Sequence, residues 1–126
     1  MKKQQEIFCD NVAEAAGPYV QGLTFGNFVY ATQVGIDGTG ALVAGGIQAQ
    51  TRQTMENLRI VLEKAGSSME KVLKCTIYIA NAADKPGMNE IYQSYFTDPF
   101  PSRCCVQVAG MSDGALVEMQ VEAYID

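Results

Sequence analysis

The chain has 126 residues, a net charge of −5 and no histidine. Its hydrophobic content of 48% and charged content of 18% are typical of a globular domain and exclude a disordered chain. The absence of histidine excludes His-based acid–base chemistry and Ser-His or Cys-His nucleophilic pairs. The nine Lys and Arg residues form no cluster beyond Lys2-Lys3, which disfavours nucleic acid as a partner.

Hydrophobic periodicity predicts one α+β domain over residues 1–126. The expected elements, in chain order, are strands over residues 19–24 and 28–34, a helix over 47–65, a strand over 72–80, a helix beginning near Asp84, and strands over 103–110 and 116–125. Gly66 fits the position just past the first helix, and Asp98-Pro99 ends the second. The order is roughly βββαβαββ, with two helices packed on one face of a mixed sheet.

The four cysteines indicate neither a metal site nor a disulfide framework. They are Cys9, Cys75, Cys104 and Cys105, and they form no C-x-x-C pair, so we expect no zinc site. Free thiols suit a reducing cytosol. No segment reaches about 18 consecutive apolar residues and the N-terminus lacks an apolar signal region, so we expect a cytoplasmic protein without a membrane span.

Alternation divides each of the last two strands into a polar and an apolar face. The polar faces comprise Arg103, Cys105, Gln107, Glu118, Gln120 and Glu122, and the apolar faces, expected against the helices, comprise Cys104, Val106, Val108, Val117, Met119, Val121 and Ala123. If a tight hairpin centred near Asp113 joins the strands, Arg103 lies opposite Glu122. Arg103 then either forms a cross-strand ion pair or, because an unpaired guanidinium is costly to bury, receives an anionic ligand.

The polar faces also carry apolar side chains. With Leu116, Tyr124 and Ala109 they are too apolar to be fully solvated, which favours packing against another copy of the chain. The polar residues would then line a cleft between subunits. A functional pair of an arginine and a carboxylate would have to span two chains.

A series of motifs between Ile7 and Ile125 keeps the order and spacing of a known family. The motifs are Gly17-Pro18-Tyr19-Val20-Gln21, Gln50-Thr51-Arg52-Gln53, Glu56-Asn57-Leu58, Ala65-Gly66-Ser67-Ser68, Val72-Leu73-Lys74-Cys75-Thr76-Ile77-Tyr78, Asn89-Glu90-Ile91-Tyr92, Pro101-Ser102-Arg103-Cys104-Cys105-Val106-Gln107-Val108-Ala109 and Val117-Glu118-Met119. Together they resemble the RidA/YjgF (Rid) family, which is also called the endoribonuclease L-PSP family.

The resemblance implies a chorismate-mutase-like α+β fold assembled as a homotrimer with clefts between subunits. It implies hydrolysis of reactive 2-enamines and 2-imines, such as 2-aminoacrylate, to 2-keto acids and ammonia without a metal or organic cofactor. The family's carboxylate-binding arginine falls on Arg103 and its water-positioning glutamate on Glu118. Its cleft tyrosine, asparagine and cysteine fall on Tyr19, Asn89 and Cys105. Each of these three residues also has a purely structural interpretation: Tyr19 as a half-buried aromatic residue, Asn89 as an amide on the surface of a helix, and Cys105 as a small buried thiol.

This chemistry agrees with the residues available. A guanidinium can grip a substrate carboxylate with two hydrogen bonds. The carbon of the C=N bond is already electrophilic, so a carboxylate that orients water suffices without histidine.

One position departs from the family pattern. Ala31-Thr32-Gln33 stands where active relatives tend to read Ser-Gly-Gln, so the cleft is expected to be narrower or differently polar. Two alternatives therefore stay open. One is a non-catalytic trimer that binds small carboxylic acids. The other is an endonuclease for single-stranded RNA or translation inhibitor, against which the acidic charge and the lack of histidine argue.

Overall fold

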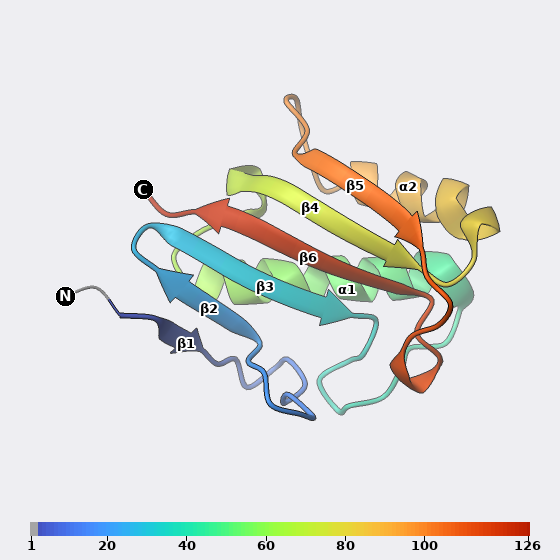
Figure 1. The fold of residues 1–126 in the computed structure, drawn as a ribbon, viewed down its shortest axis with the longest axis horizontal. Coiled ribbons are helices and arrows are strands. Elements are labelled where there is room, and N and C mark those ends of the chain that lie inside the picture. The colour runs from blue at the N-terminus through green and yellow to red at the C-terminus, as the bar shows by residue number, and fades with distance from the viewer. Residues whose placement is uncertain (1–2) are drawn as a thin grey trace.

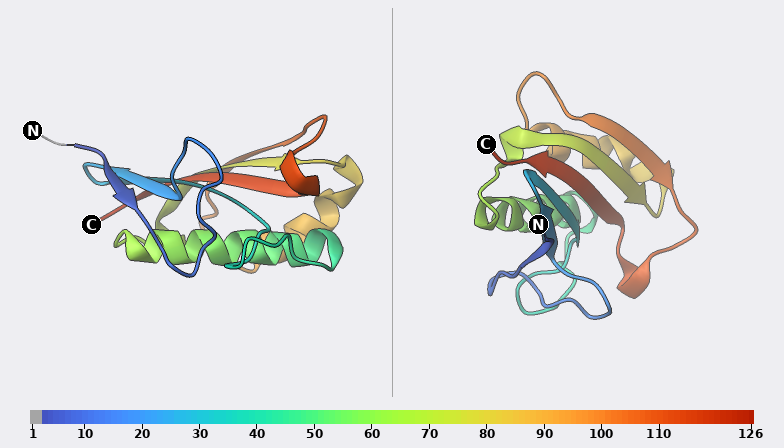
Figure 2. Two further views of the ribbon diagram at one scale, coloured as in Figure 1. Left: turned by 90° about the horizontal axis from the view of Figure 1, so that it is seen from below. Right: turned by 60° about the vertical axis from the view of Figure 1, so that its left-hand side comes forward.

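The computed structural model describes residues 3–126 as a six-stranded mixed sheet with two α-helices on one face (Figures 1 and 2). The elements are β1 (Gln5–Ile7), β2 (Gly22–Phe25), β3 (Phe28–Val34), α1 (Gly46–Lys64), β4 (Val72–Ile79), α2 (Lys85–Gln93), β5 (Ser102–Gln107) and β6 (Val117–Tyr124), with short 3₁₀ turns at Met69–Lys71, Ala82–Asp84 and Ser112–Gly114. The strands lie in the order β1-β2-β3-β6-β4-β5. Only the β4–β5 pair is parallel among these strands.

The element order βββαβαββ and the placement of both helices on one face of the sheet confirm the predicted fold class. Each predicted helix and strand is present within a few residues of its expected bounds. The predicted order has three strands before the first helix, but the residue pattern defines bounds for only two of them, because the three residues of β1 are too few to show alternation.

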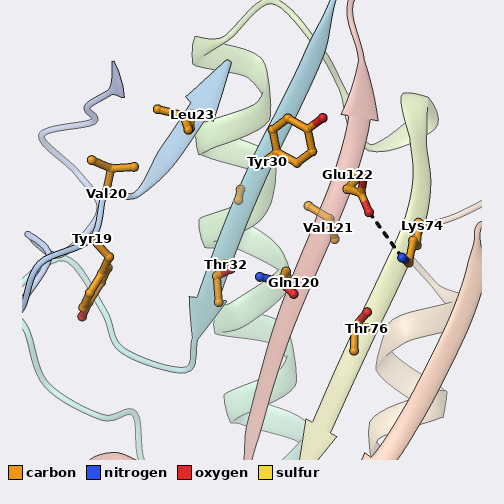
Figure 3. Close-up of a pocket in the computed structure, with 11 residues that line it drawn as sticks. Tyr19, Val20, Leu23, Tyr30, Thr32, Lys74, Thr76, Gln120, Val121 and Glu122 are labelled. Carbon is orange, nitrogen blue, oxygen red and sulfur yellow. Dashed lines mark ion pairs between the residues drawn. The ribbon is translucent and has the colours of Figure 1, made fainter. Parts of the chain in front are cut away.

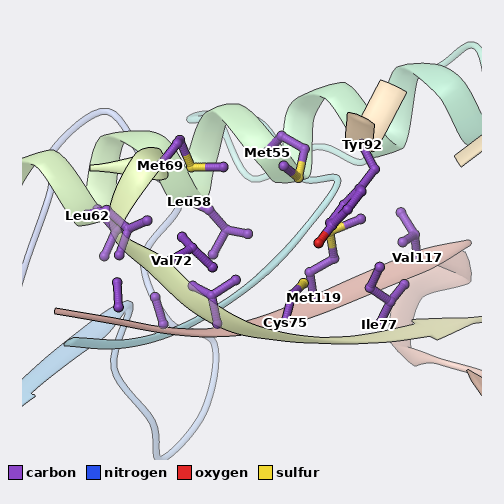
Figure 4. Packing of buried hydrophobic residues seen from close by; sticks show 14 of the residues in the cluster. Met55, Leu58, Leu62, Met69, Val72, Cys75, Ile77, Tyr92, Val117 and Met119 are labelled. Atoms are coloured by element: carbon purple, nitrogen blue, oxygen red, sulfur yellow. The ribbon is translucent and has the colours of Figure 1, made fainter. Parts of the chain in front are cut away.

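The core lies between the sheet and α1. The inward residues of β6 were predicted correctly, since Val117, Met119, Val121 and Ala123 are all buried. They belong to one cluster with Met55, Leu58 and Leu62 of α1 (Figure 4). Burying a side chain of this size contributes about 1.5–3 kcal/mol to folding, so this layer holds the middle of the sheet in place.

The predicted hairpin between the last two strands is wrong. β6 enters the sheet between β3 and β4, whereas β5 pairs in parallel with the far side of β4. A parallel pair needs a crossover, which α2 supplies, and the long connection over residues 108–116 lets the chain pass across β4. Arg103 therefore lies beside Cys75, and Glu122 lies beside Lys74.

The facing of β5 also differs from the prediction. Arg103 and Cys105 lie beside the buried Cys75 and Ile77, so they face the helices, while Cys104 and Val106 are exposed on the other side of the sheet. Alternation shows which residues share a face but not which side that face takes. β5 is an edge strand with polar and apolar groups on both sides. Its register with β4 therefore decides which of its residues face the helices.

The other face of the sheet, which we call the open face, is covered by neither helix (Figure 2). Large side chains stand exposed on it, including Phe28, Tyr30 and Tyr124. Within residues 3–126, neither helix combines the length and apolar character needed to cross a membrane.

Candidate functional site

Arg103 is held by neutral groups. Its Nη1 donates a hydrogen bond of 2.7 Å to Oδ1 of Asn89 on α2. Its guanidinium carbon lies 4.9 Å from the centre of the Tyr92 ring. None of the ion pairs within residues 3–126 involves Arg103. The side chain is exposed, so its charge faces solvent without a neutralising carboxylate from the described part of the chain.

The helix α2 positions this arrangement. Asn89 and Tyr92 are three residues apart, so they share one face of the helix. Met88 and Tyr92 are buried, which packs that face toward the sheet. Pro86 lies in the first turn, where its missing N–H costs no hydrogen bond. We call the group of Arg103, Asn89, Tyr92 and Cys105 the β5–α2 half-site.

The two cysteines on the helix-facing side of this region differ in burial. Cys105 is half-buried and packs against the core cluster. Cys75 is 1% exposed, and its burial raises the pKa of the thiol to about 12 although the nearby charge of Arg103 acts in the opposite direction. Because the reactive form of cysteine is the thiolate, Cys75 is a packing residue and not a nucleophile.

A second group of predicted residues surrounds a cavity on the open face. Tyr19, Ala31 and Thr32 line this open-face cavity of about 460 Å³ (Figure 3). The side chain of Ala31 is buried, whereas Thr32 is half-buried beside Gln120 of β6. Tyr19 is 63% exposed, and its hydroxyl accepts a hydrogen bond of 3.2 Å from the backbone N–H of Ala16. The aromatic ring is therefore presented to the outside.

Glu118 lies on the open face close to this cavity. It is two residues from Gln120 on β6 and is flanked by Val34 and Tyr78 on the neighbouring strands. It is half-buried and makes no side-chain hydrogen bond or ion pair with the described residues. Its carboxylate is free to accept a hydrogen bond from water or a ligand.

The predicted site residues thus form two groups within one chain. Arg103, Asn89 and Cys105 come together on the helix side of the edge strand. Tyr19, Ala31, Thr32 and Glu118 lie around the open face, with β4 between Glu118 and β5. One subunit does not bring Arg103 and Glu118 together.

The sequence reasoning missed Tyr92 as a contact of Arg103. In the sequence Tyr92 stood out only as the last residue of the motif Asn89-Glu90-Ile91-Tyr92. The available signal was its spacing of three from Asn89 on a predicted helix. Within residues 3–126, no group of three His, Cys, Asp or Glu side chains is arranged to hold a metal ion.

Comparisons with known proteins agree with the motifs. A family model described as Endoribonuclease L-PSP matches residues 9–125. Over 123 residues the chain is 40% identical to a RutC family protein of Pyrococcus horikoshii, covering 96% of this chain and 98% of the relative. Over 121 residues it is 33% identical to a 2-iminobutanoate/2-iminopropanoate deaminase of Salmonella typhimurium, covering 93% and 94%.

The fold is also that of solved relatives. The crystal structure of E. coli TdcF with bound serine matches with a TM-score of 0.90 at 30% identity, covering 97% of this chain and 99% of that one. Sequence and fold therefore lead to the same assignment. The chain belongs to the endoribonuclease L-PSP family, the RidA/YjgF family whose motifs its sequence carries.

Proposed function

We propose that this chain hydrolyses reactive 2-enamines and 2-imines of the 2-aminoacrylate type to 2-keto acids and ammonia. The observation that carries the proposal is Arg103, an exposed guanidinium whose partners in the described chain are an amide oxygen and an aromatic ring. A site built to receive a carboxylate needs such an uncompensated cation. The Salmonella relative named 2-iminobutanoate/2-iminopropanoate deaminase supports the same reaction class.

Arg103 would bind the substrate carboxylate. One donor, Nη1, is engaged by Asn89, and the rest of the guanidinium can donate to the two carboxylate oxygens. A charge-assisted hydrogen bond of this kind contributes about 1.5–3 kcal/mol where water is excluded. Cys105, two residues further along the same side of β5, would border the bound substrate.

Glu118 would position the attacking water. The water oxygen adds to C2 of the imine, and the carboxylate of Glu118 takes one water proton and passes it to the imine nitrogen, which gives a neutral carbinolamine. Glu118 then takes the hydroxyl proton of the carbinolamine and delivers it to the amino nitrogen, so that the C–N bond breaks, ammonia leaves and the C=O bond forms. Imine and water thus yield 2-keto acid and ammonia with no cofactor.

The complete site would form between two copies of the chain, within a homotrimer. Arg103 and Glu118 face opposite sides of one sheet, so the β5–α2 half-site of one subunit would have to meet the open-face cavity of another. The exposed Phe28, Tyr30 and Tyr124 on the open face support its burial against a second copy.

We further propose that residues 1–126 form one domain. The four free thiols lead us to propose that the protein works in the cytoplasm.

The test is the decay of 2-aminoacrylate generated from serine by a dehydratase and trapped with semicarbazide. The protein should divert 2-aminoacrylate to pyruvate and reduce the trapped semicarbazone, and Arg103→Ala should abolish this effect while keeping the circular dichroism of the folded protein. Decay that is unchanged by the wild-type protein, or equal activity in Arg103→Ala, would refute the proposal.

Analytical ultracentrifugation should give three times the chain mass, and a monomer with full activity would refute the intersubunit site.

The second candidate is a trimer that binds small carboxylic acids without turnover. Thr32 favours it, because its branched side chain lines the open-face cavity beside Gln120, where a glycine would leave more room (Figure 3). E. coli TdcF, described with bound serine, is a relative that holds a small carboxylic acid. Calorimetry with 2-ketobutyrate should show binding whether the protein is a deaminase or only a binding protein. Only the semicarbazide assay distinguishes these two functions. A ribonuclease remains the weakest alternative because the net charge is −5.

A further inference from the structure

Tyr92 forms a platform beneath Arg103. The guanidinium carbon is 4.9 Å from the ring centre, within the range of a cation–π interaction. Tyr92 is 4% exposed, whereas Arg103 on the edge strand is exposed, so the ring lies on the protein side of the guanidinium. Asn89 binds Nη1 at 2.7 Å from the same face of α2. Together they restrain the position of the guanidinium.

Both partners of Arg103 are neutral, which distinguishes it from Arg59. Arg59 donates to Glu56 at 2.7 Å and to Glu63 at 3.1 Å, so its charge is already compensated. A carboxylate beside Arg103 would compete with an anionic ligand for the same donors. An aromatic face and an amide oxygen instead hold the side chain while leaving its positive charge available.

The ring of Tyr92 is itself fixed by the core. It packs against Phe96 with 4.8 Å between ring centres and an angle of 51° between the planes. Figure 4 shows Tyr92 reaching from the helix layer toward the sheet, above Met119. The ring therefore cannot move away from Arg103 without disturbing packed neighbours.

The hydroxyl of Tyr92 has no part in holding Arg103. It is buried and has no hydrogen-bond partner among the described residues. Burial raises the pKa of Tyr92, so the phenol stays neutral. An unsatisfied hydroxyl costs stability, hence the benefit of an aromatic residue here must come from its ring.

We infer that Tyr92 is a positioning residue, whose ring holds the Arg103 guanidinium in the orientation that receives the substrate carboxylate. This inference deepens the proposed function and, for its role in substrate binding, rests on it. The hold of Tyr92 on Arg103 is a property of the free protein and can be measured without substrate.

The experiment compares Tyr92→Leu with Tyr92→Phe. The side-chain Nε–Hε signal of Arg103, assigned with Arg103→Lys, should show the upfield ring-current shift in wild type and Tyr92→Phe and lose it in Tyr92→Leu. Affinity for 2-ketobutyrate, measured by calorimetry, should fall roughly two- to thirtyfold in Tyr92→Leu and stay within about twofold in Tyr92→Phe. KM should rise by a similar factor with little change in kcat, because the carboxylate is gripped in ground state and transition state alike.

Phe96→Leu is the matched control. It replaces the partly buried ring beside Tyr92 with another apolar side chain, while the buried core cluster to which Tyr92 belongs, with Met88 and Met119, keeps the Tyr92 face beneath Arg103. It should keep the shifted Arg103 signal and the affinity of wild type. If Tyr92→Leu does not fold, the inference is tested by the Arg103 Nε–Hε signal of wild type and Tyr92→Phe. A chemical shift in these two proteins equal to that of free arginine overturns the inference.

An unchanged Arg103 signal and unchanged affinity in Tyr92→Leu would also overturn the inference. A loss of affinity in Phe96→Leu equal to that in Tyr92→Leu would do the same, since it would indicate general loosening of the helix. If wild type neither binds 2-ketobutyrate nor hydrolyses 2-aminoacrylate, the proposed function fails, while the Arg103 signal still tests the platform separately.

Discussion

Glu122 forms its ion pair with Lys74, with 3.5 Å between Oε2 and Nζ (Figure 3). Lys74 is the neighbour of Glu122 on β4, whereas Arg103 lies beyond β4 and on the other side of the sheet. The carboxylate that the sequence suggested as a structural partner of Arg103 is thus paired with a different cation. Both side chains of the Glu122 pair are well exposed, so the pair itself contributes little to stability.

Arg103→Lys should lower kcat/KM for 2-aminoacrylate hydrolysis by about tenfold or more. A lysine keeps the charge, but its ammonium cannot bond Asn89 and grip two carboxylate oxygens at once. Steady-state kinetics with coupled detection of pyruvate would measure the change. Arg52→Lys on the exposed side of α1 is the control and should behave as wild type. Full activity in Arg103→Lys would contradict the bidentate grip.

Glu118→Gln should lower kcat by roughly a hundredfold while keeping the affinity for 2-ketobutyrate within a few-fold. Glutamine preserves the shape of the side chain on the open face but cannot take a proton from water. Kinetics and calorimetry on the same preparation separate the two effects. Glu70→Gln, on the turn before β4, should leave both unchanged. A wild-type kcat in Glu118→Gln would exclude it as the proton acceptor.

Glu56→Gln should reduce stability in a pH-dependent way. Glu56 accepts a hydrogen bond of 2.7 Å from Arg59 within α1 and another of 2.7 Å from the hydroxyl of Tyr95, which ties α1 to the segment after α2. These bonds, that of Arg59 above all, hold the pKa of Glu56 below its ordinary value of 4.5. A lowered folded-state pKa gives stability that is present above the unfolded pKa and is lost as the pH falls through the folded one.

Urea unfolding at pH 7, 5 and 3 would check this expectation. At pH 7 the variant should lose about 0.2–1 kcal/mol, a small value because the Arg59 pair is more than a third exposed. The difference should disappear toward pH 3. Glu14→Gln, an exposed control on a loop, should follow wild type at each pH. A constant difference at all three values would show that the charge of Glu56 is not responsible.

Gln21→Leu should destabilise the loop that carries Tyr19. Gln21 is 4% exposed, its Nε2 donates to the carbonyls of Cys9, Val12 and Ala13, and its Oε1 accepts from the N–H of Cys9. Leucine would leave these backbone groups unsatisfied, at a cost of about 2–4 kcal/mol in the free energy of unfolding.

Urea unfolding and limited proteolysis would measure the effect of Gln21→Leu. Cleavage should appear between Cys9 and Tyr19. Gln93→Leu, at the exposed end of α2, is the matched control and should change neither readout. Unchanged unfolding and protease resistance in Gln21→Leu would mean that the loop is held by other contacts.

Local pattern in the sequence determined the elements and most of the core. Helical spacing placed α1, and alternation identified the buried residues of β6, such as Met119, because the side-chain period of a helix or strand is a property of the local backbone. Family motifs selected Arg103, Asn89 and Glu118 as candidates, and the assignment to the family is confirmed. Their roles remain predictions.

Only the tertiary structure decided how those elements meet. Alternation is the same whether β5 pairs with β6 or with β4, so the sequence could not show that Arg103 faces the helices or that Tyr92 lies beneath it. It also could not show that Arg103 and Glu118 lie on opposite faces of one sheet. Strand order and register depend on contacts between residues that lie far apart in the chain. Local periodicity does not specify those contacts.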